Sequence, residues 1–212
     1  TLMVDPFNPK RRMLFAEVLN KDGTPFENDP RYRIRQFLQT VWERHQEIPV
    51  VGLEPEFFLI EREEDGTPIP TDYNLYFDRF QEHPIPVQQV LFEAIEALLA
   101  VKVNVANTTS EVAGSQHEWV IEAKFPPKDE GPKPWIDQDL PYRFLSALRT
   151  LDEFMLYKYI LKETAKRHGK EISFEAKPFA GVNGSGMHTH LSFFKPDDQG
   201  KLQNLFAARD PK

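Results

Sequence analysis

The sequence predicts an α+β fold, with flanking helices on a curved and largely antiparallel sheet. Short apolar or β-branched runs bounded by Asp-Gly turns predict hairpin strands. Longer stretches with apolar residues spaced three and four apart predict amphipathic helices. Hairpin strands mixed with long helices are typical of an α+β layer fold. No internal repeat or low-complexity tract interrupts the chain, so we expect residues 1–212 to form a single domain.

Capping and turn residues set the boundaries of the predicted elements. Asp29 supplies an N-cap and Pro30 a first helical residue, whereas Gly169 ends the last helix. The predicted buried side of that last helix comprises Phe144, Leu148, Leu151, Met155 and Leu161. The predicted helices are 30–44, 86–100 and 139–168, and the predicted strands are 13–19, 49–61, 67–72, 101–109, 118–125, 171–178 and 186–194, with 126–134 as a proline-rich loop.

Composition excludes several classes of protein. The 212 residues are 40% hydrophobic and 28% charged, as in ordinary soluble globular proteins. A net charge of −7 argues against nucleic-acid binding, which needs a basic face. The longest apolar stretch, 84–105, is interrupted by Glu93, Glu96 and Lys102, so no membrane span is expected. The absence of cysteine and of a signal pattern at the N-terminus leads us to expect a cytoplasmic protein.

A glycine-rich loop runs directly into an alternating strand between residues 177 and 193. Its three glycines would let the backbone approach a small ligand closely. Residues two apart share a face of an extended strand, so His188, His190 and Ser192 point one way. The alternate residues Met187, Thr189, Leu191 and Phe193 point the other way and form a mainly apolar face that would anchor the strand. A lone His-x-His is most often a surface hairpin, but the loop, the histidines and the serine together favour a ligand site.

Two further segments carry paired carboxylates in apolar surroundings. Glu54 and Glu56 fall on one face of the predicted strand 49–61, and Glu111 and Glu118 flank a glycine-containing turn. Neighbouring carboxylates repel each other and are costly to bury unless a cation or base neutralises them. Either pair alone could equally be surface acid. With His188 they make an oxygen-rich set that favours Mg²⁺ or Mn²⁺, and two ions would balance the charge.

The run from residue 177 to 192 resembles the Lys-Pro-x-x-Gly-x-Asn-Gly-Ser-Gly-Met-His-x-His-x-Ser signature of the glutamine synthetase superfamily. That superfamily includes relatives that join glutamate to polyamines. The resemblance covers roughly residues 31–206 and the type I-like catalytic domain. It implies an ATP-dependent ligase, which activates the γ-carboxylate of glutamate as an acyl phosphate for attack by ammonia or an amine. It also implies a homo-oligomer that uses Mg²⁺ or Mn²⁺.

The resemblance further implies a role for each motif residue. The ligands of the first divalent ion would be Glu56, Glu111 and Glu118, and those of the second would be Glu54 and His188. The loop residues that would meet the amino-acid substrate are Asn183 and Gly184. The nucleotide contacts would be His190 and Ser192.

The chain also departs from the family pattern. It begins after the point where the family's small β-grasp domain ends, and it stops before the family's arginine cluster and last metal-binding glutamate. Ala106 stands where a glutamate that helps to hold the nucleotide is usual, and Gly114-Ser115 replaces Pro-Gly. We therefore expect a partial catalytic domain that is inactive in isolation. The alternative is a non-catalytic binding or structural protein that retains the metal site.

Overall fold

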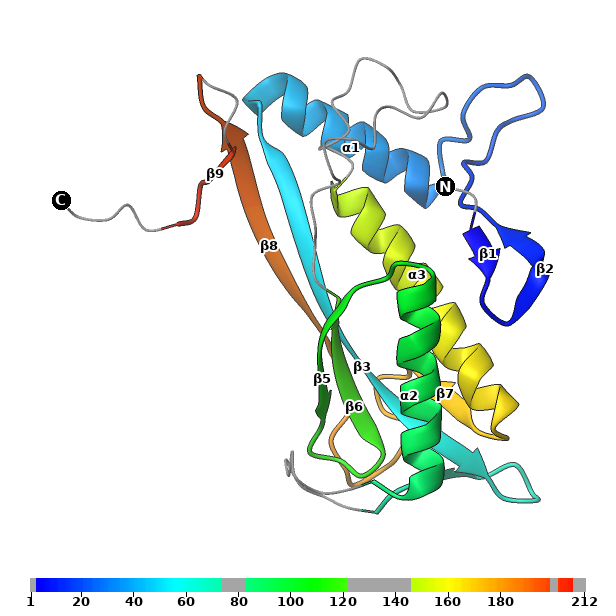
Figure 1. The fold of residues 1–212 in the computed structure, drawn as a ribbon. Coiled ribbons are helices and arrows are strands. Elements are labelled where there is room, and N and C mark those ends of the chain that lie inside the picture. Colours follow the sequence, from blue (N-terminus) through cyan, green and yellow to red (C-terminus); the bar gives the residue numbers. More distant parts are fainter. Residues whose placement is uncertain (1–2, 74–82, 122–145, 199–201, 208–212) are drawn as a thin grey trace. The chain divides into compact units, whose positions relative to one another are not determined.

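The computed structural model describes residues 3–73, 83–121, 146–198 and 202–207 (Figure 1). These residues divide into two compact units. The first unit comprises the described parts of Thr1–Met13, Leu53–Glu122 and Glu153–Thr189. The second comprises the described parts of Leu14–Gly52, Ala123–Asp152 and His190–Lys212. Among the described residues, no helix combines the length and the apolar character that a membrane crossing requires.

The first unit holds a small hairpin, most of an antiparallel sheet and helix α2. Its elements are β1 (Met3–Asp5), β2 (Asn8–Met13), β3 (Ile48–Arg62, in this unit from Leu53), β4 (Pro68–Pro70), α2 (Ile85–Ala100), β5 (Val105–Ser110), β6 (Gln116–Ile121), α3 (Ser146–Arg167, from Glu153), β7 (Glu171–Ser173) and the start of β8 (Met187–Pro196). Strand β6 lies between β5 and β3, and β4 and β7 also pair with β3. All of these pairings are antiparallel, which confirms the predicted α+β class.

One face of β3 and β6 carries an aromatic core. Phe57 of β3 packs edge-on against Trp119 of β6, with ring centroids 5.4 Å apart, and against Tyr157 of α3 at 6.3 Å. All three side chains are buried. Because side chains alternate along a strand, the residues on either side of Phe57 and Trp119 project from the opposite face of the sheet. That opposite face is where the predicted acidic residues lie.

Helix α2 contacts β5 and buries the apolar stripe that its sequence predicts. The buried residues of this helix include Val87, Val90, Ala94 and Leu98. The following strand starts at Val105, so the predicted start at residue 101 is wrong. The amides of Val101, Lys102 and Val103 donate to carbonyls in the last turn of α2, and Lys102 has φ 65°. These residues therefore close the helix instead of pairing with a strand.

Helix α3 ends at the predicted glycine. Gly169 has φ 69°, and the amide of Lys170 donates to the carbonyl of Ala165 at 2.9 Å, as in a glycine C-cap. The predicted buried side is partly wrong, because Met155 is 56% exposed. The buried residues of the helix include Leu148, Leu156, Tyr157, Ile160 and Leu161. The predicted helical residues 139–145, with Phe144, lie outside the described residues.

The second unit contains α1 (Pro30–His45), the starts of β3 and α3, the remainder of β8, and β9 (Leu202–Asn204). Asp29 caps α1 as predicted, since its carboxylate accepts from the amide of Arg31 at 3.1 Å. Two small apolar clusters stabilise the unit. The first comprises Leu38, Ala147, Leu148, Ile34 and Val51, and the second comprises Ile48, Trp42, Val50, Phe194 and Leu202. Strand β9 pairs antiparallel with β8.

The predicted strand at 13–19 is wrong. Strand β2 ends at Met13, and the apolar residues Leu14 and Val18 that follow are exposed, so they provide no buried face for a strand. Leu19 forms an isolated antiparallel bridge with Pro25. The actual strand, β2, was missed because its sequence is dominated by charged residues.

Most other boundaries agree with the sequence. Helix α1 and strands β3, β4 and β8 lie within a few residues of their predicted ranges. Strand β7 spans three residues, so the predicted strand 171–178 is too long. Strand β6 begins two residues before the predicted start at Glu118. Residues 122–125 and the predicted loop 126–134 lie outside the described residues.

Candidate functional site

Cross-strand register places the four predicted glutamates on one face of the sheet. Glu56 lies directly opposite Glu118 in the β3–β6 pairing. Glu54 precedes Glu56 by two residues and therefore shares its face. The amide of Glu111 donates to the carbonyl of Gln116 at 2.8 Å, which extends the β5–β6 ladder by one residue. Gln116 precedes Glu118 by two residues, so all four carboxylates project on the same side.

The carboxylates are close enough to perturb one another. Burial raises the pKa of Glu111, and the charge of Glu56 raises it further. The pKa of Glu118 is raised by burial and then by the charges of Glu111, Glu54 and Glu56, whereas His188 lowers it. Like charges held together in partly desolvated surroundings are unfavourable unless a cation accompanies them. The acidic face thus has the electrostatic character of a cation site.

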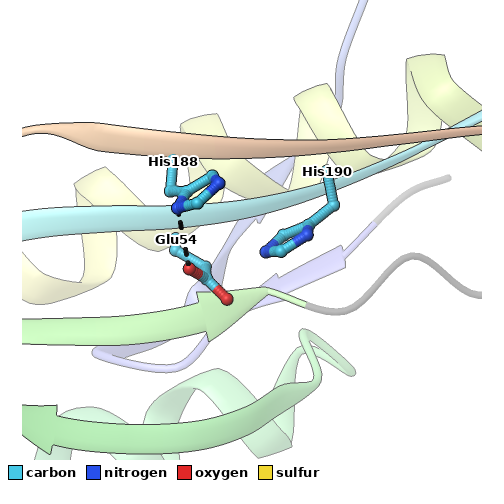
Figure 2. A group of neighbouring side chains, drawn as sticks. All are labelled: Glu54, His188 and His190. Carbon is cyan, nitrogen blue, oxygen red and sulfur yellow. Dashed lines mark ion pairs between the residues drawn. The ribbon is translucent and has the colours of Figure 1, made fainter.

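His188 approaches the acidic face from β8. Its Nδ1 lies 3.7 Å from Oε2 of Glu54 (Figure 2). Two ligand atoms at this separation can both reach one divalent ion at bond lengths of about 2.0–2.1 Å. The Glu54 side chain is 20% exposed and that of His188 is 68% exposed, so solvent and ligands can reach the pair. Figure 2 also draws His190, two residues further along β8, where the second unit begins.

The glycine-rich loop packs closely against β3 and against its own preceding segment. The carbonyl of Gly186 accepts from the amide of Glu56 at 3.1 Å. A Cβ built on Gly184 would lie 2.3 Å from the carbonyl oxygen of Ala176, so a larger residue does not fit there. A Cβ on Gly186 would lie 3.4 Å from Oε1 of Glu56. The close packing of the loop therefore requires glycine at position 184, whereas a Cβ at position 186 would make an ordinary contact with Glu56.

Gln116 is a site residue that sequence reasoning missed. It is 2% exposed, and its Nε2 donates to Oε2 of Glu56 at 2.7 Å and to the carbonyl of Gly184 at 2.9 Å. A longer contact of 3.4 Å reaches Oγ of Ser185. The available signal was its place two residues before Glu118, on the face that carries the acids. Its amide connects β6, β3 and the glycine-rich loop.

The other predicted contact residues lie on the loop and on β8. Asn183 is exposed on the loop beside Gly184, His190 is exposed, and Ser192 is half-buried. The prediction that the apolar face of β8 anchors the strand is wrong in part, because Met187 and Leu191 are about half exposed. In the second unit, β8 is held instead by its pairing with β9 and by Phe194 in the Ile48 cluster.

A histidine cluster lies on the sheet face opposite the acids. His117 is buried against Phe57, with ring centroids 5.4 Å apart, and burial lowers its pKa to about 3. His83 lies beside it at 5.1 Å between ring centroids. The Nδ1 of His83 is 3.1 Å from Oδ2 of Asp72, and its Nε2 is 2.8 Å from Oγ of Ser110. These contacts connect the end of β5 and the start of β6 on the sheet face opposite the acids.

Comparisons with known proteins agree with the geometry. Residues 27–127 and 137–212 match the family described as "Glutamine synthetase, catalytic domain". A glutamine synthetase of Thermotoga maritima is 35% identical over 191 residues, which cover 89% of this chain and 38% of that protein. A glutamine synthetase of Thermus thermophilus is 32% identical, over 92% of this chain and 39% of that protein.

Solved structures support the same relationship. A structure of apo GmaS without ligand superposes with a TM-score of 0.72 at 25% identity, covering 99% of this chain and 43% of that one. A Plasmodium falciparum glutamine synthetase, at 18% identity and a TM-score of 0.67, shares the fold. The chain thus spans about two fifths of the length of the relatives it matches. Since the family match covers most of its residues, the chain belongs to the glutamine synthetase family and represents part of the catalytic domain.

Proposed function

We propose that the acidic face holds two divalent cations, Mg²⁺ or Mn²⁺, in an ATP-dependent ligase that joins glutamate to ammonia or an amine. The observation that carries this proposal is the convergence of four glutamates and His188 on one sheet face. Family membership supplies the reaction class. When bound, such ions neutralise charge on nucleotide phosphates and on the transferred phosphoryl group.

The donor set fits hard cations. Four carboxylates and one imidazole offer mainly oxygen, which Mg²⁺ and Mn²⁺ prefer, and the chain has no cysteine to favour zinc. The raised pKa values of Glu111 and Glu118 reflect burial and like-charge repulsion, both of which a cation would relieve. We assign Glu56, Glu111 and Glu118 to the first ion, and Glu54 and His188 to the second.

The loop and β8 would hold the substrates. We propose that Asn183 and Gly184 meet glutamate, and that His190 and Ser192 contact ATP. The position of Gly184 supports this assignment, because its carbonyl accepts from the same Gln116 amide that binds Glu56. Glutamate on this loop would therefore lie close to the ions. We further propose that the full enzyme is a homo-oligomer, as the family resemblance implies.

A second candidate function is a non-catalytic protein that keeps the metal site. Ala106 favours this alternative, since it stands where the family pattern has a glutamate that helps to hold the nucleotide. We propose that the 212 residues alone bind metal, bind ATP weakly and make no glutamine, because they span about two fifths of the relatives' length. ATP- and glutamate-dependent amide formation by these residues alone would contradict that proposal. A longer form that binds Mn²⁺ but not ATP would favour the non-catalytic alternative.

Calorimetric titration with Mn²⁺ tests the metal site. The wild-type chain should bind Mn²⁺, and Glu56→Ala and Glu118→Ala should weaken binding on the order of 100-fold or more, since each removes a direct ligand. Glu163→Ala is the matched control, because Glu163 lies on α3 in a surface pair with Lys166. Absence of binding, or equal binding by all four proteins, would contradict the assignment.

A further inference from the structure

Gln116 lies where the acidic face meets the glycine-rich loop. We propose that Gln116 is a positioning residue, which fixes Glu56 as a metal ligand and couples cation binding to the order of the loop. The inference rests on the proposed metal site and adds to it a residue that holds no ion itself.

The hydrogen bonds of Gln116 determine how its amide is oriented. A carboxylate oxygen of Glu56 and the carbonyl of Gly184 both accept only, so the group that faces them must be the NH₂. Its two hydrogens match these two acceptors, at 2.7 and 2.9 Å. The side chain is 2% exposed, so water cannot readily replace either bond. The amide is therefore held at both hydrogens.

The hydrogen bond from Gln116 to Glu56 would help a cation site, because it fixes the conformation of a proposed ligand. Glu118 lies directly opposite Glu56, and repulsion between the two carboxylates would turn the Glu56 side chain away. The Gln116 amide is uncharged, so it holds one Glu56 oxygen in place without neutralising the carboxylate. A lysine or arginine at this position would neutralise it. Glu56 is thus held in one conformation before an ion binds.

The bond to the loop connects the ion to the candidate substrate segment. The loop is fastened on one side by Gln116 and on the other by the amide of Ser185, which donates to the carbonyl of Ala176 at 2.9 Å. The carbonyl of Gly186 accepts from the amide of Glu56 itself. A cation that fixes Glu56 therefore also favours the ordered loop, and by reciprocity an ordered loop favours the cation.

Gln116→Met tests the coupling, because methionine has nearly the same shape and lacks the NH₂. We expect the dissociation constant for Mn²⁺ to rise about 10- to 100-fold, which is typical of a lost outer-shell partner. Mn²⁺ should slow hydrogen exchange at the Ser185 amide in the wild type and not in the variant. Gln88→Met is the matched control, since the Nε2 of Gln88 also donates to a backbone carbonyl, that of His83. This control should bind Mn²⁺ as the wild type does.

The outcomes separate this inference from the proposed function. Equal Mn²⁺ affinity of Gln116→Met and the wild type would overturn the role of Gln116 and leave the metal site intact. Equal weakening by Gln88→Met would show a general loss of stability and would also overturn it. A wild-type chain that binds no Mn²⁺ would refute both proposals. If Gln116→Met does not fold, Gln116→Asn replaces it, because its amide is one carbon too short to reach both acceptors and should give the same loss of affinity.

Discussion

Acidification should destabilise the protein through His117, by an amount that follows from its burial. An unfolded histidine titrates near 6.5, whereas burial lowers the pKa of His117 to about 3 in the fold. The unfolded chain therefore takes up this proton at higher pH than the folded chain does. The stability that the fold gains from keeping His117 neutral is fully present above pH 6.5 and is lost as the pH falls toward 3. Each pH unit in this window is worth about 1.4 kcal/mol, so the loss is about 2 kcal/mol at pH 5 and about 3 kcal/mol at pH 4.

His117→Phe isolates this contribution. The ring stays in contact with Phe57 but cannot titrate, and in the described part of the chain the Nε2 of His117 has no hydrogen-bond partner to lose. The free energy of unfolding, measured with urea between pH 7 and pH 4, should fall less steeply in the variant. Relative to the wild type, the variant should gain about 2 kcal/mol between pH 7 and pH 5.

Other titrating groups do not obscure this comparison. The raised pKa values of Glu111 and Glu118 mean that these carboxylates take up protons more readily in the fold, so acid stabilises the fold through them. Both proteins carry these groups, on the sheet face opposite His117. His45→Gln, which changes an exposed histidine at the end of α1, should give a curve parallel to the wild type. A parallel curve for His117→Phe as well would refute the reasoning.

Two further predictions concern the acidic face and the loop. Glu111→Gln should raise the melting temperature of the chelator-treated protein, because it removes a repelling charge, and should reduce the increase that Mn²⁺ produces. A melting temperature that is indifferent to both changes would indicate scattered surface acids instead. Gly184→Ala should cost more than about 2 kcal/mol in the free energy of unfolding by urea, because its Cβ would lie 2.3 Å from the carbonyl oxygen of Ala176. Gly181→Ala, at φ +79° with open space around it, should cost only about 1 kcal/mol, and equal losses in the two variants would contradict the packing described for the loop.

The placement of the acids could be predicted because it depends on short-range rules. Alternation along β3 determines that Glu54 and Glu56 share a face, and Trp119 beside Glu118 identifies which face of β6 is buried. The convergence of the two pairs required the β3–β6 register, which depends on contacts between distant residues. Gln116 was missed for the same reason, since its partners are 60 and 68 residues away in the sequence.

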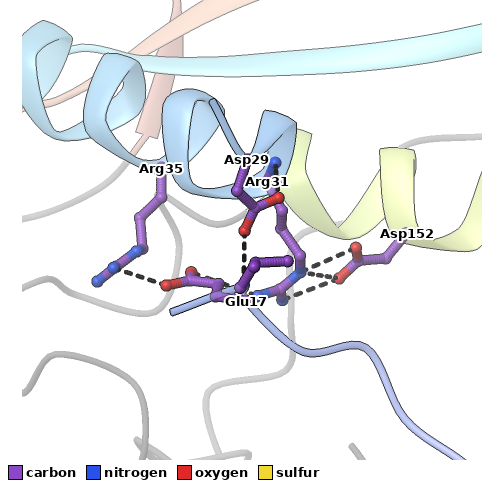
Figure 3. A network of polar contacts seen from close by, with 6 residues as sticks. Glu17, Asp29, Arg31, Arg35 and Asp152 are labelled. Carbon is purple, nitrogen blue, oxygen red and sulfur yellow. Dashed lines mark hydrogen bonds and ion pairs between the residues drawn. The ribbon is translucent and has the colours of Figure 1, made fainter. Parts of the chain in front are cut away.

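The mistaken strand at 13–19 shows the limit of hydrophobic patterns. Apart from a short backbone pairing with Pro25 and Phe26, side chains and not a sheet hold this segment (Figure 3). The carboxylate of Asp29 accepts from the amide of Val18 at 3.0 Å, and Glu17 pairs with Arg35 at 2.8 Å and with Arg31 at 3.4 Å. Arg31 in turn binds Asp152 through two nitrogens. Such a network between separate segments leaves no periodic signal in the sequence.

The register of β5, β6 and β3 also means that an inserted or deleted residue can move Glu118 off the acidic face. One residue inserted within β6, between Gln116 and Glu118, would either break the pairing of β6 with β3 or turn Glu118 toward Phe57 and Tyr157, where a carboxylate would be buried among aromatic rings. An insertion at the exposed Asp65-Gly66 turn would displace only the short edge strand β4. Insertions and deletions should therefore be tolerated at this turn and eliminated within β6, even where no site residue is itself replaced.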